Sequence, residues 1–160
     1  MPTEKGITPQ PQTLNPLELL KAIAIFRELE TADLEQIVAG ANWVRCPAGK
    51  IIIQEGEIGH WLYLLLSGRV QVHLGDLQLT ELAPGAFFGE ISLFDAQPRS
   101  ATVTALEDCE CLVISEQQIF QLICAQPVVA IAMIKVLAER VRELNRLFLS
   151  AEEIAFSRRS

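Results

Sequence analysis

The spacing of hydrophobic and polar positions changes twice along the chain, which divides it into three regions. In the first region, Pro16 falls in the first turn of a helical pattern, and Thr31 is a good N-cap for a second short helix. We expect these helices within residues 17–45, after a flexible arm over residues 1–16 that has little to bury. The apolar positions at helical spacing are Leu17, Leu20, Ile23, Ala24, Leu34, Ile37 and Val38.

Residues 46–115 have the pattern of short strands separated by turns. Val70 and Val72 alternate with polar residues, which predicts a half-buried strand. The Gly75-Asp76 pair that follows predicts a tight hairpin into the next strand. Several short strands at such spacing are typical of a sandwich, a jelly roll or a barrel.

The third region, residues 116–150, is helical again, and we expect residues 151–160 to be a flexible tail. Pro127 divides the region into a short helix and a longer one. The longer helix carries an apolar stripe that steps by four and three residues. The stripe packs either on the protein's own strands or against a second copy in a homodimer. We favour the homodimer because the stripe continues beyond the reach of the strands; its members are Ala130, Ile134, Leu137, Val141, Leu144 and Phe148.

Composition limits the compartments and partners open to the protein. Half of the 160 residues are hydrophobic and the mean hydropathy is +0.28, yet no apolar run is long enough to span a bilayer. The N-terminus also lacks the apolar core of a signal peptide. Residues 1–126 carry 7 basic and 16 acidic side chains, whereas residues 127–160 carry 6 and 4, and such an acidic body argues against wrapping a nucleic acid. We therefore predict a cytoplasmic protein with no DNA and no membrane partner.

Metal and catalytic chemistry find little support in the sequence. The four cysteines form no CxxC pair and no zinc-type spacing, and Cys109 and Cys111 would share one face of a strand as small core residues. The two histidines, His60 and His73, lack the HxH spacing of metal-binding jelly-roll enzymes. No serine or cysteine has a convincing histidine partner. We therefore predict no catalytic residue, no metal site and no cofactor, and we expect that the protein is not an enzyme.

The segment FGEISLFDAQPRSATV, residues 88–103, places an isolated Glu90 and Arg99 among small and apolar residues. The residues after Glu90 can form one helical turn whose N-terminal amides would bind an anion. Arg99 can bind two phosphate oxygens at once, and the small Ser100 and Ala101 leave their amides open to a ligand. Glu90 would repel a phosphate but suits a sugar hydroxyl, which donates to a carboxylate. This combination indicates a cyclic nucleotide; the alternative is a surface ion pair in a loop, worth about 0–1 kcal/mol.

The same segment resembles the phosphate-binding cassette of cyclic-nucleotide-binding domains, a family that includes the regulatory subunits of protein kinase A and the catabolite activator protein. The family pattern is F-G-E-(I/L)-(A/S)-L, a short spacer and P-R-(A/S/T)-A, and each fixed position is matched. The resemblance covers about residues 17–148, including the segment IIIQEGEIGHWLYLLLSGRVQVH. It implies a mainly β fold, a β jelly roll (double-stranded β-helix) with flanking helices. Residues 17–150 would form one domain, with the β-roll at 46–115 and C-terminal helices at 116–150.

The resemblance also implies roles for individual residues. Glu90 would accept the ribose 2′-hydroxyl, Arg99 would bind the exocyclic phosphate oxygens, and Gly89 would allow close approach to the ribose. Backbone amides of the short helical turn and of Ala101 would complete the phosphate cradle. The implied ligand-binding residues are Gly89, Glu90, Ile91, Ser92, Arg99, Ser100 and Ala101.

Ser100 stands at a position that varies with base preference in this family. Thr there often accompanies cGMP and Ala accompanies cAMP, while Ser is intermediate and occurs in bacterial cAMP receptors. The expected ligand is therefore cAMP, with cGMP second. His60 replaces the acidic residue that usually follows Gly59, which we expect to affect a turn more than the site. The candidates to cover the base are Leu144, Leu147 and Phe148.

In this family, nucleotide binding closes the cassette on the phosphate and moves the C-terminal helix over the base. The resemblance thus implies a stand-alone sensor or regulatory subunit that signals to an unknown protein effector through this helix. About ten residues follow Ser150, too few for a helix-turn-helix, which agrees with the prediction of no DNA partner. The alternative is a degenerate cyclic-nucleotide-binding fold that acts as a protein–protein interaction domain without nucleotide.

Overall fold

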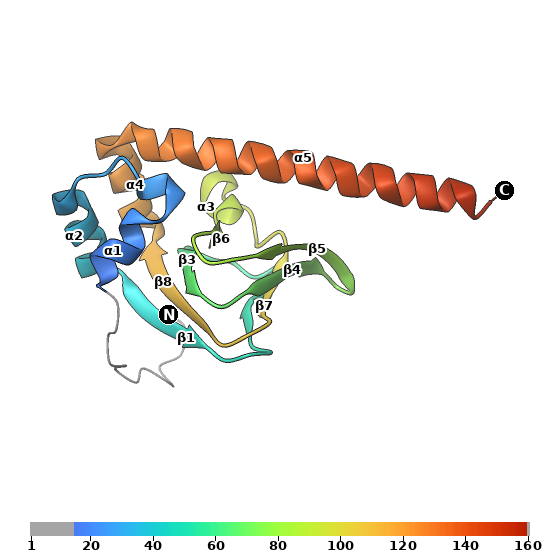
Figure 1. The fold of residues 1–160 in the computed structure, drawn as a ribbon, viewed down its shortest axis with the longest axis horizontal. Coiled ribbons are helices and arrows are strands. Elements are labelled where there is room, and N and C mark those ends of the chain that lie inside the picture. The colour runs from blue at the N-terminus through green and yellow to red at the C-terminus, as the bar shows by residue number, and fades with distance from the viewer. Residues whose placement is uncertain (1–14, 160) are drawn as a thin grey trace.

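The computed structural model describes residues 15–159, which form a β-roll with helices before and after it (Figure 1). The strands form two antiparallel sheets of four strands each, ordered β1-β8-β3-β6 and β2-β7-β4-β5. This arrangement confirms the predicted jelly-roll fold with flanking helices. The first sheet contains β1 (Asn42–Cys46), β8 (Cys109–Ser115), β3 (Trp61–Ser67) and β6 (Phe87–Phe88), and the second contains β2 (Ile51–Ile53), β7 (Thr102–Ala105), β4 (Val70–Leu74) and β5 (Leu77–Leu82).

The helices before the roll and the first helix after it gather at one end, whereas the long C-terminal helix starts at that end and runs across the roll (Figure 1). Most of the predicted flexible arm lies outside the described residues, while the Asn15 side chain accepts from the Leu17 amide and caps the first helix. The helical elements are α1 (Pro16–Lys21), the 3-10 turn η1 (Ala24–Phe26), α2 (Thr31–Gly40), α3 (Ile91–Asp95), α4 (Glu116–Ala125) and α5 (Pro127–Ser157).

Two apolar clusters hold these elements together. One lies between the helices and the outer side of the first sheet, with Phe26, Leu34 and Met133 fully enclosed. The other fills the inside of the roll. Cys109 and Cys111 belong to this inner cluster, which confirms their prediction as small core residues. Close packing of such an interior fixes the strands that carry the candidate site.

The hairpin between β4 and β5 is present as predicted. Leu74 pairs with Leu77 across the two-residue turn, and Gly75 has a φ of 56°. A positive φ of this kind is free of steric cost for glycine, which lacks a Cβ atom.

The predicted boundary between the helices and the β-roll is wrong. Helix α2 ends at Gly40, and residues 42–46 already form strand β1, which pairs with β8 from Asn42 opposite Val113 to Cys46 opposite Cys109. The pairing of β1 with β8, a strand far along the chain, leaves no local sequence signal. The predicted start of the β-roll at residue 46 is therefore later than the observed start of β1. Thr31 is also the first residue of α2 rather than its N-cap.

Helix α4 is capped by Ser115, whose hydroxyl accepts from the Gln118 amide at 3.2 Å, and it ends before Pro127 as predicted. Helix α5 then leaves at an angle of 113° to α4. It continues to Ser157, so the predicted helix end near residue 150 and the flexible tail over residues 151–160 are wrong. No glycine or proline occurs in residues 151–157, and most are good helix formers, so nothing there stops the helix.

The C-terminal end of α5 projects past the strands (Figure 1). In residues 15–159 no single helix has both the length and the apolar composition to cross a bilayer, although the bent pair of α4 and α5 meets both criteria together.

Candidate ligand-binding site

A cavity of about 1020 Å³ lies between the second sheet, α3 and α5. Its sheet side is apolar and includes Ile53, Phe88 and Val103, which also belong to the inner core cluster. Its polar side comes from two stretches of chain, one around α3 and one before β7. The structure brings all seven predicted residues to this cavity: Gly89, Glu90, Ile91, Ser92, Arg99, Ser100 and Ala101.

Gly89 makes the sharp turn from strand β6 into α3. It has a φ of 83°, and a Cβ atom there would lie 3.0 Å from the Trp61 carbonyl oxygen and 2.9 Å from Nη1 of Arg99. Any larger residue would therefore be strained and would crowd Arg99. The glycine lets the backbone approach both groups closely.

The short helix α3 follows directly. The Glu90 carbonyl accepts from the amides of Leu93 and Phe94 at 3.0 and 3.2 Å, which closes the turn. The amides of Ile91 and Ser92 lie in the first turn, where a helix has no internal acceptor for them. Both residues line the cavity, so their amides remain candidates for the predicted phosphate cradle.

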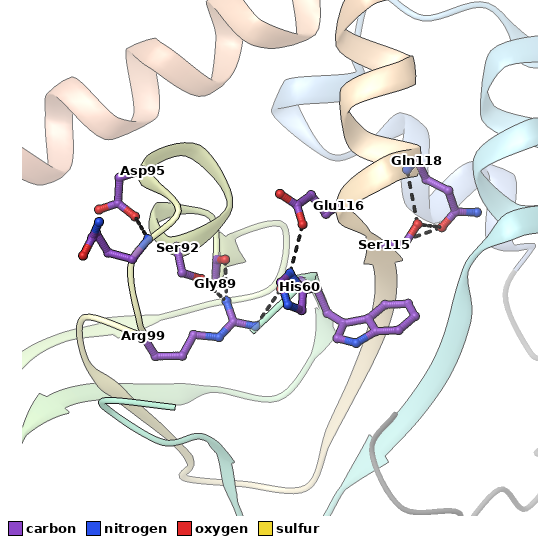
Figure 2. A network of polar contacts seen from close by, with 10 residues as sticks. His60, Gly89, Ser92, Asp95, Arg99, Ser115, Glu116 and Gln118 are labelled. Atoms are coloured by element: carbon purple, nitrogen blue, oxygen red, sulfur yellow. Dashed lines mark hydrogen bonds and ion pairs between the residues drawn. The ribbon is translucent and has the colours of Figure 1, made fainter. Parts of the chain in front are cut away.

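Arg99 is only 7% exposed, and its guanidinium is fixed by three oxygen atoms. Nη1 donates to the Gly89 carbonyl at 2.6 Å and to the Ser92 hydroxyl at 2.9 Å, and Nη2 donates to the Trp61 carbonyl at 2.9 Å. Figure 2 shows Arg99 reaching between the turn at Gly89 and Ser92 and the segment at His60. All three acceptors are neutral groups.

Burial lowers the pKa of Arg99, since the charged form loses solvation. Within residues 15–159 no carboxylate lies at ion-pair distance from its guanidinium. A buried cation without a counter-charge is costly, and an arriving anion would offset that cost.

Glu90 is 4% exposed and has a cationic partner. Its Oε1 accepts from Nη1 of Arg140, on α5, at 3.0 Å. Arg140 also donates to the Phe87 carbonyl, and its guanidinium lies over the Phe87 ring at 4.6 Å from the centroid. Helix α5 is thus joined to the site by an ion pair, a hydrogen bond and a cation–π contact.

The two buried charges therefore give the site a definite preference. Glu90 forms its ion pair with Arg140, so among residues 15–159 Arg99 has no carboxylate at ion-pair distance, and the charge of Glu90 acts on it only from further away. On its Arg99 side the site offers a cation that can bind an anion. Beside Glu90 it offers a carboxylate that can accept from a hydroxyl.

Two functional groups were missed by the sequence analysis. The Trp61 carbonyl carries no sequence signal, since every residue has one. Arg140 did have a signal, because it follows the apolar Val129, Met133 and Val136 at helical spacing, and the structure shows that Val129 and Met133 are buried. Of the three candidates to cover the base, Leu144 lines the cavity.

Other predicted features are also placed by the structure. The His60 ring bonds to Glu116 at 3.0 Å rather than to Arg99, consistent with a role in the turn (Figure 2). Ser100 borders the cavity and is exposed to solvent. Among residues 15–159, no group of three or more His, Cys, Asp or Glu side chains is arranged to hold a metal ion.

Comparisons with known proteins agree with this geometry. The sequence pattern of the family described as "Cyclic nucleotide-binding domain" matches residues 43–125. A cyclic AMP receptor protein of Thermus thermophilus is 42% identical over 141 residues, which cover 84% of this chain and 65% of that protein. A cyclic nucleotide-gated potassium channel of Rhizobium etli is 38% identical over 95 residues, covering 59% of this chain and 26% of the channel.

Among solved structures, the catabolite activator protein of Thermus thermophilus superposes with a TM-score of 0.68 at 34% identity, over 83% of this chain and 63% of that one. The chain thus spans about two thirds of its receptor relative and about a quarter of the channel.

Proposed function

The chain belongs to the cyclic-nucleotide-binding domain family, and from this premise we propose that it is a cyclic-nucleotide sensor or regulatory subunit that binds cAMP. cGMP is the second candidate ligand. The effector is an unknown protein, and we propose no catalytic activity. The expected cytoplasmic location and the absence of DNA and membrane partners stay predictions.

The observation that carries the proposal is the buried guanidinium of Arg99 at the edge of the cavity, which among residues 15–159 has no carboxylate at ion-pair distance. A cyclic phosphate is a diester with one negative charge, which matches this single cation. An open 5′-nucleotide carries close to two negative charges at neutral pH because its second phosphate pKa is about 6. Beside this single cation the cyclic form needs no further counter-charge, whereas the open form would bury a second negative charge without a partner, which is costly.

Glu90 supplies the second half of the recognition. Its Oε1 bonds to Arg140, and its other carboxylate oxygen remains to accept from a ribose hydroxyl. The apolar sheet side of the cavity, with Ile53 and Val103, would contact the faces of the base. Ser100 and the likeness to a cyclic AMP receptor protein favour adenine over guanine.

Isothermal titration of nucleotide-stripped protein with cAMP and with cGMP tests the proposal, with 5′-AMP as the control ligand. We expect micromolar or tighter binding of cAMP, weaker binding of cGMP, and little binding of 5′-AMP. If neither cyclic form binds, the nucleotide proposal is wrong. The degenerate fold that serves as an interaction domain would then be the better account.

We further propose that the ligand acts on α5 through Glu90. A ribose hydroxyl at this carboxylate changes the surroundings of the Glu90–Arg140 ion pair, and Arg140 also holds α5 to Phe87. The ligand would thereby shift the balance between two positions of α5, which requires contacts that differ between those positions. The effector protein would bind differently to the two positions of this helix.

The exposed stripe of α5 supports the proposed homodimer. Ile134 and Phe148 are exposed and do not line the cavity, so a second copy can cover them, whereas Leu137, Val141 and Leu144 of the same stripe border the cavity. Phe148→Ser should convert dimer to monomer in analytical ultracentrifugation. The control is Leu149→Ser, a neighbour of similar exposure that lies off the stripe. Equal behaviour of both variants would contradict a dimer contact through the stripe.

A further inference from the structure

The loop between β2 and β3, residues 54–60, holds Arg99 by its backbone as well as by its side chain. The Arg99 amide donates to the Glu57 carbonyl at 2.8 Å, and the Arg99 carbonyl accepts from the Gly56 amide at 2.9 Å. Directly after the loop, the Trp61 carbonyl accepts from the guanidinium. The loop therefore determines where Arg99 lies relative to the cavity.

Gly59 lies against the guanidinium itself. A Cβ atom on Gly59 would be 2.0 Å from Nε, 2.2 Å from Cζ and 2.4 Å from Nη2 of Arg99. No side chain of any kind fits there while Arg99 keeps its three acceptors. Arg99 is the flexible member of this pair, so it would be displaced while the loop keeps its backbone.

The backbone of Gly59 does not itself require glycine. Its φ lies outside the left-handed region, whereas Gly56 and Gly89 have φ values of 83°. Alanine at Gly59 is therefore free of backbone strain and changes only the space beside Arg99. Glycine is therefore needed at this position to leave space for the Arg99 side chain, and not for the conformation of the turn.

The loop is also tied to the helices. The His60 ring bonds to the Glu116 carboxylate at 3.0 Å, and the His60 carbonyl accepts from the Glu116 amide at 2.9 Å. Glu116 is the first residue of α4, so the segment behind Arg99 is anchored to the N-terminus of that helix (Figure 2).

We propose that Gly59 is a positioning residue for anion binding, which leaves space for the Arg99 guanidinium between the β2–β3 loop and α3 while the His60–Glu116 contacts anchor the loop from behind. The inference rests on the proposed nucleotide site. Gly59 lies against Arg99 and is not among the residues that line the cavity, so it would act on the ligand only through the position of the guanidinium.

The test combines Gly59→Ala with Arg99→Ala in a double-mutant cycle, with cAMP titration as the readout. We expect Gly59→Ala alone to weaken binding at least tenfold, and to change nothing further in the Arg99→Ala background, because the displaced group is then absent. Ile58→Ala, an exposed neighbour in the same loop, is the control and should bind like the parent.

A spectroscopic readout separates positioning from a general loss of structure. The ¹H–¹⁵N cross-peak of the Arg99 Nε–H, assigned by its absence in Arg99→Lys, should shift or broaden in Gly59→Ala and stay unchanged in Ile58→Ala. If Gly59→Ala alone unfolds, the Arg99→Ala double variant should regain the fold, since the clash is removed.

The outcomes distinguish the two proposals. If the parent binds no cyclic nucleotide, the proposed function fails, and the shifted cross-peak still supports positioning by Gly59. If the parent binds and Gly59→Ala binds equally well with an unchanged cross-peak, the inference about Gly59 is overturned. Unfolding of Gly59→Ala in both backgrounds would overturn it too, because the glycine would then serve the fold independently of Arg99.

Discussion

Arg99 and Glu90 are buried charges of one segment, but their surroundings differ in kind. Arg99 is held by neutral oxygens, all of them on the β-roll or on α3. Glu90 is neutralised by Arg140, a residue of the long C-terminal helix. An anion can therefore join Arg99 without displacing a partner, whereas any change at Glu90 reaches α5. The difference assigns binding mainly to Arg99 and the response of the helix mainly to Glu90.

The largest expected effect comes from removing the charge that has no counter-charge. Arg99→Ala deletes a charge-assisted interaction worth about 1.5–3 kcal/mol in a shielded site. The affinity for cAMP should therefore fall about tenfold to a hundredfold, since 1.4 kcal/mol corresponds to a factor of ten. Titration calorimetry measures this change.

Arg45→Ala is the matched control for this loss of charge, because Arg45 is exposed on β1, outside the cavity lining. It should bind cAMP like the parent. If Arg99→Ala also binds like the parent, the assignment of the phosphate to Arg99 is wrong.

The second-largest expected effect is a loss of stability when Glu90 loses its ion pair with helix α5. Arg140→Ala leaves the buried Glu90 carboxylate without its cation and removes the contacts to Phe87. Removing one partner of a fully buried pair costs about 3–5 kcal/mol, and Arg140 keeps some exposure, so we expect a loss of about 2 kcal/mol in the free energy of unfolding. At about 2–4 °C per kcal/mol, the melting temperature should fall by roughly 4–8 °C.

Lys135→Ala, an exposed cation on the same helix, should leave the melting temperature within about 1 °C of the parent. Equal melting temperatures for Arg140→Ala and Lys135→Ala would mean that the ion pair does not hold α5 to the roll.

The smallest expected effect measures how much the negative charge of Glu90 contributes to the affinity for cAMP. Glu90→Gln keeps the shape and an acceptor oxygen but removes the charge, so a charge-assisted hydrogen bond becomes a neutral one. The difference is about 0.5–1.5 kcal/mol, which predicts a threefold to tenfold weaker affinity for cAMP. Glu35→Gln, exposed on α2, is the control. A loss larger than that of Arg99→Ala would reverse the roles given to the two charges.

Local patterns predicted the short strands and the β4–β5 hairpin, whereas the resemblance of a contiguous motif to a known family implied the jelly roll and the seven residues that border the cavity. The start of β1 was misplaced because it is decided by pairing with β8, more than sixty residues away. The end of α5 was misplaced because the last residues carry no helix-breaking signal that would fix a boundary.

Side-chain partners were harder to predict than positions. Two of the three acceptors of Arg99 are backbone carbonyls, which no residue type reveals. The partner of Glu90 lies fifty residues away on a separate helix. Glu90 and Arg99 could be named from the segment itself, but the contrast between their surroundings depends on how β3 and α5 pack around it.

The central claim is that a cyclic nucleotide joins Arg99 and, through Glu90, changes α5. Amide hydrogen exchange of the parent protein with and without saturating cAMP tests both parts in one measurement. We expect slower exchange in residues 88–103 and, together with it, altered exchange in α5 around Arg140. Unchanged exchange in residues 88–103 would contradict ligand binding at this site, and a change confined to those residues would contradict the link to the helix.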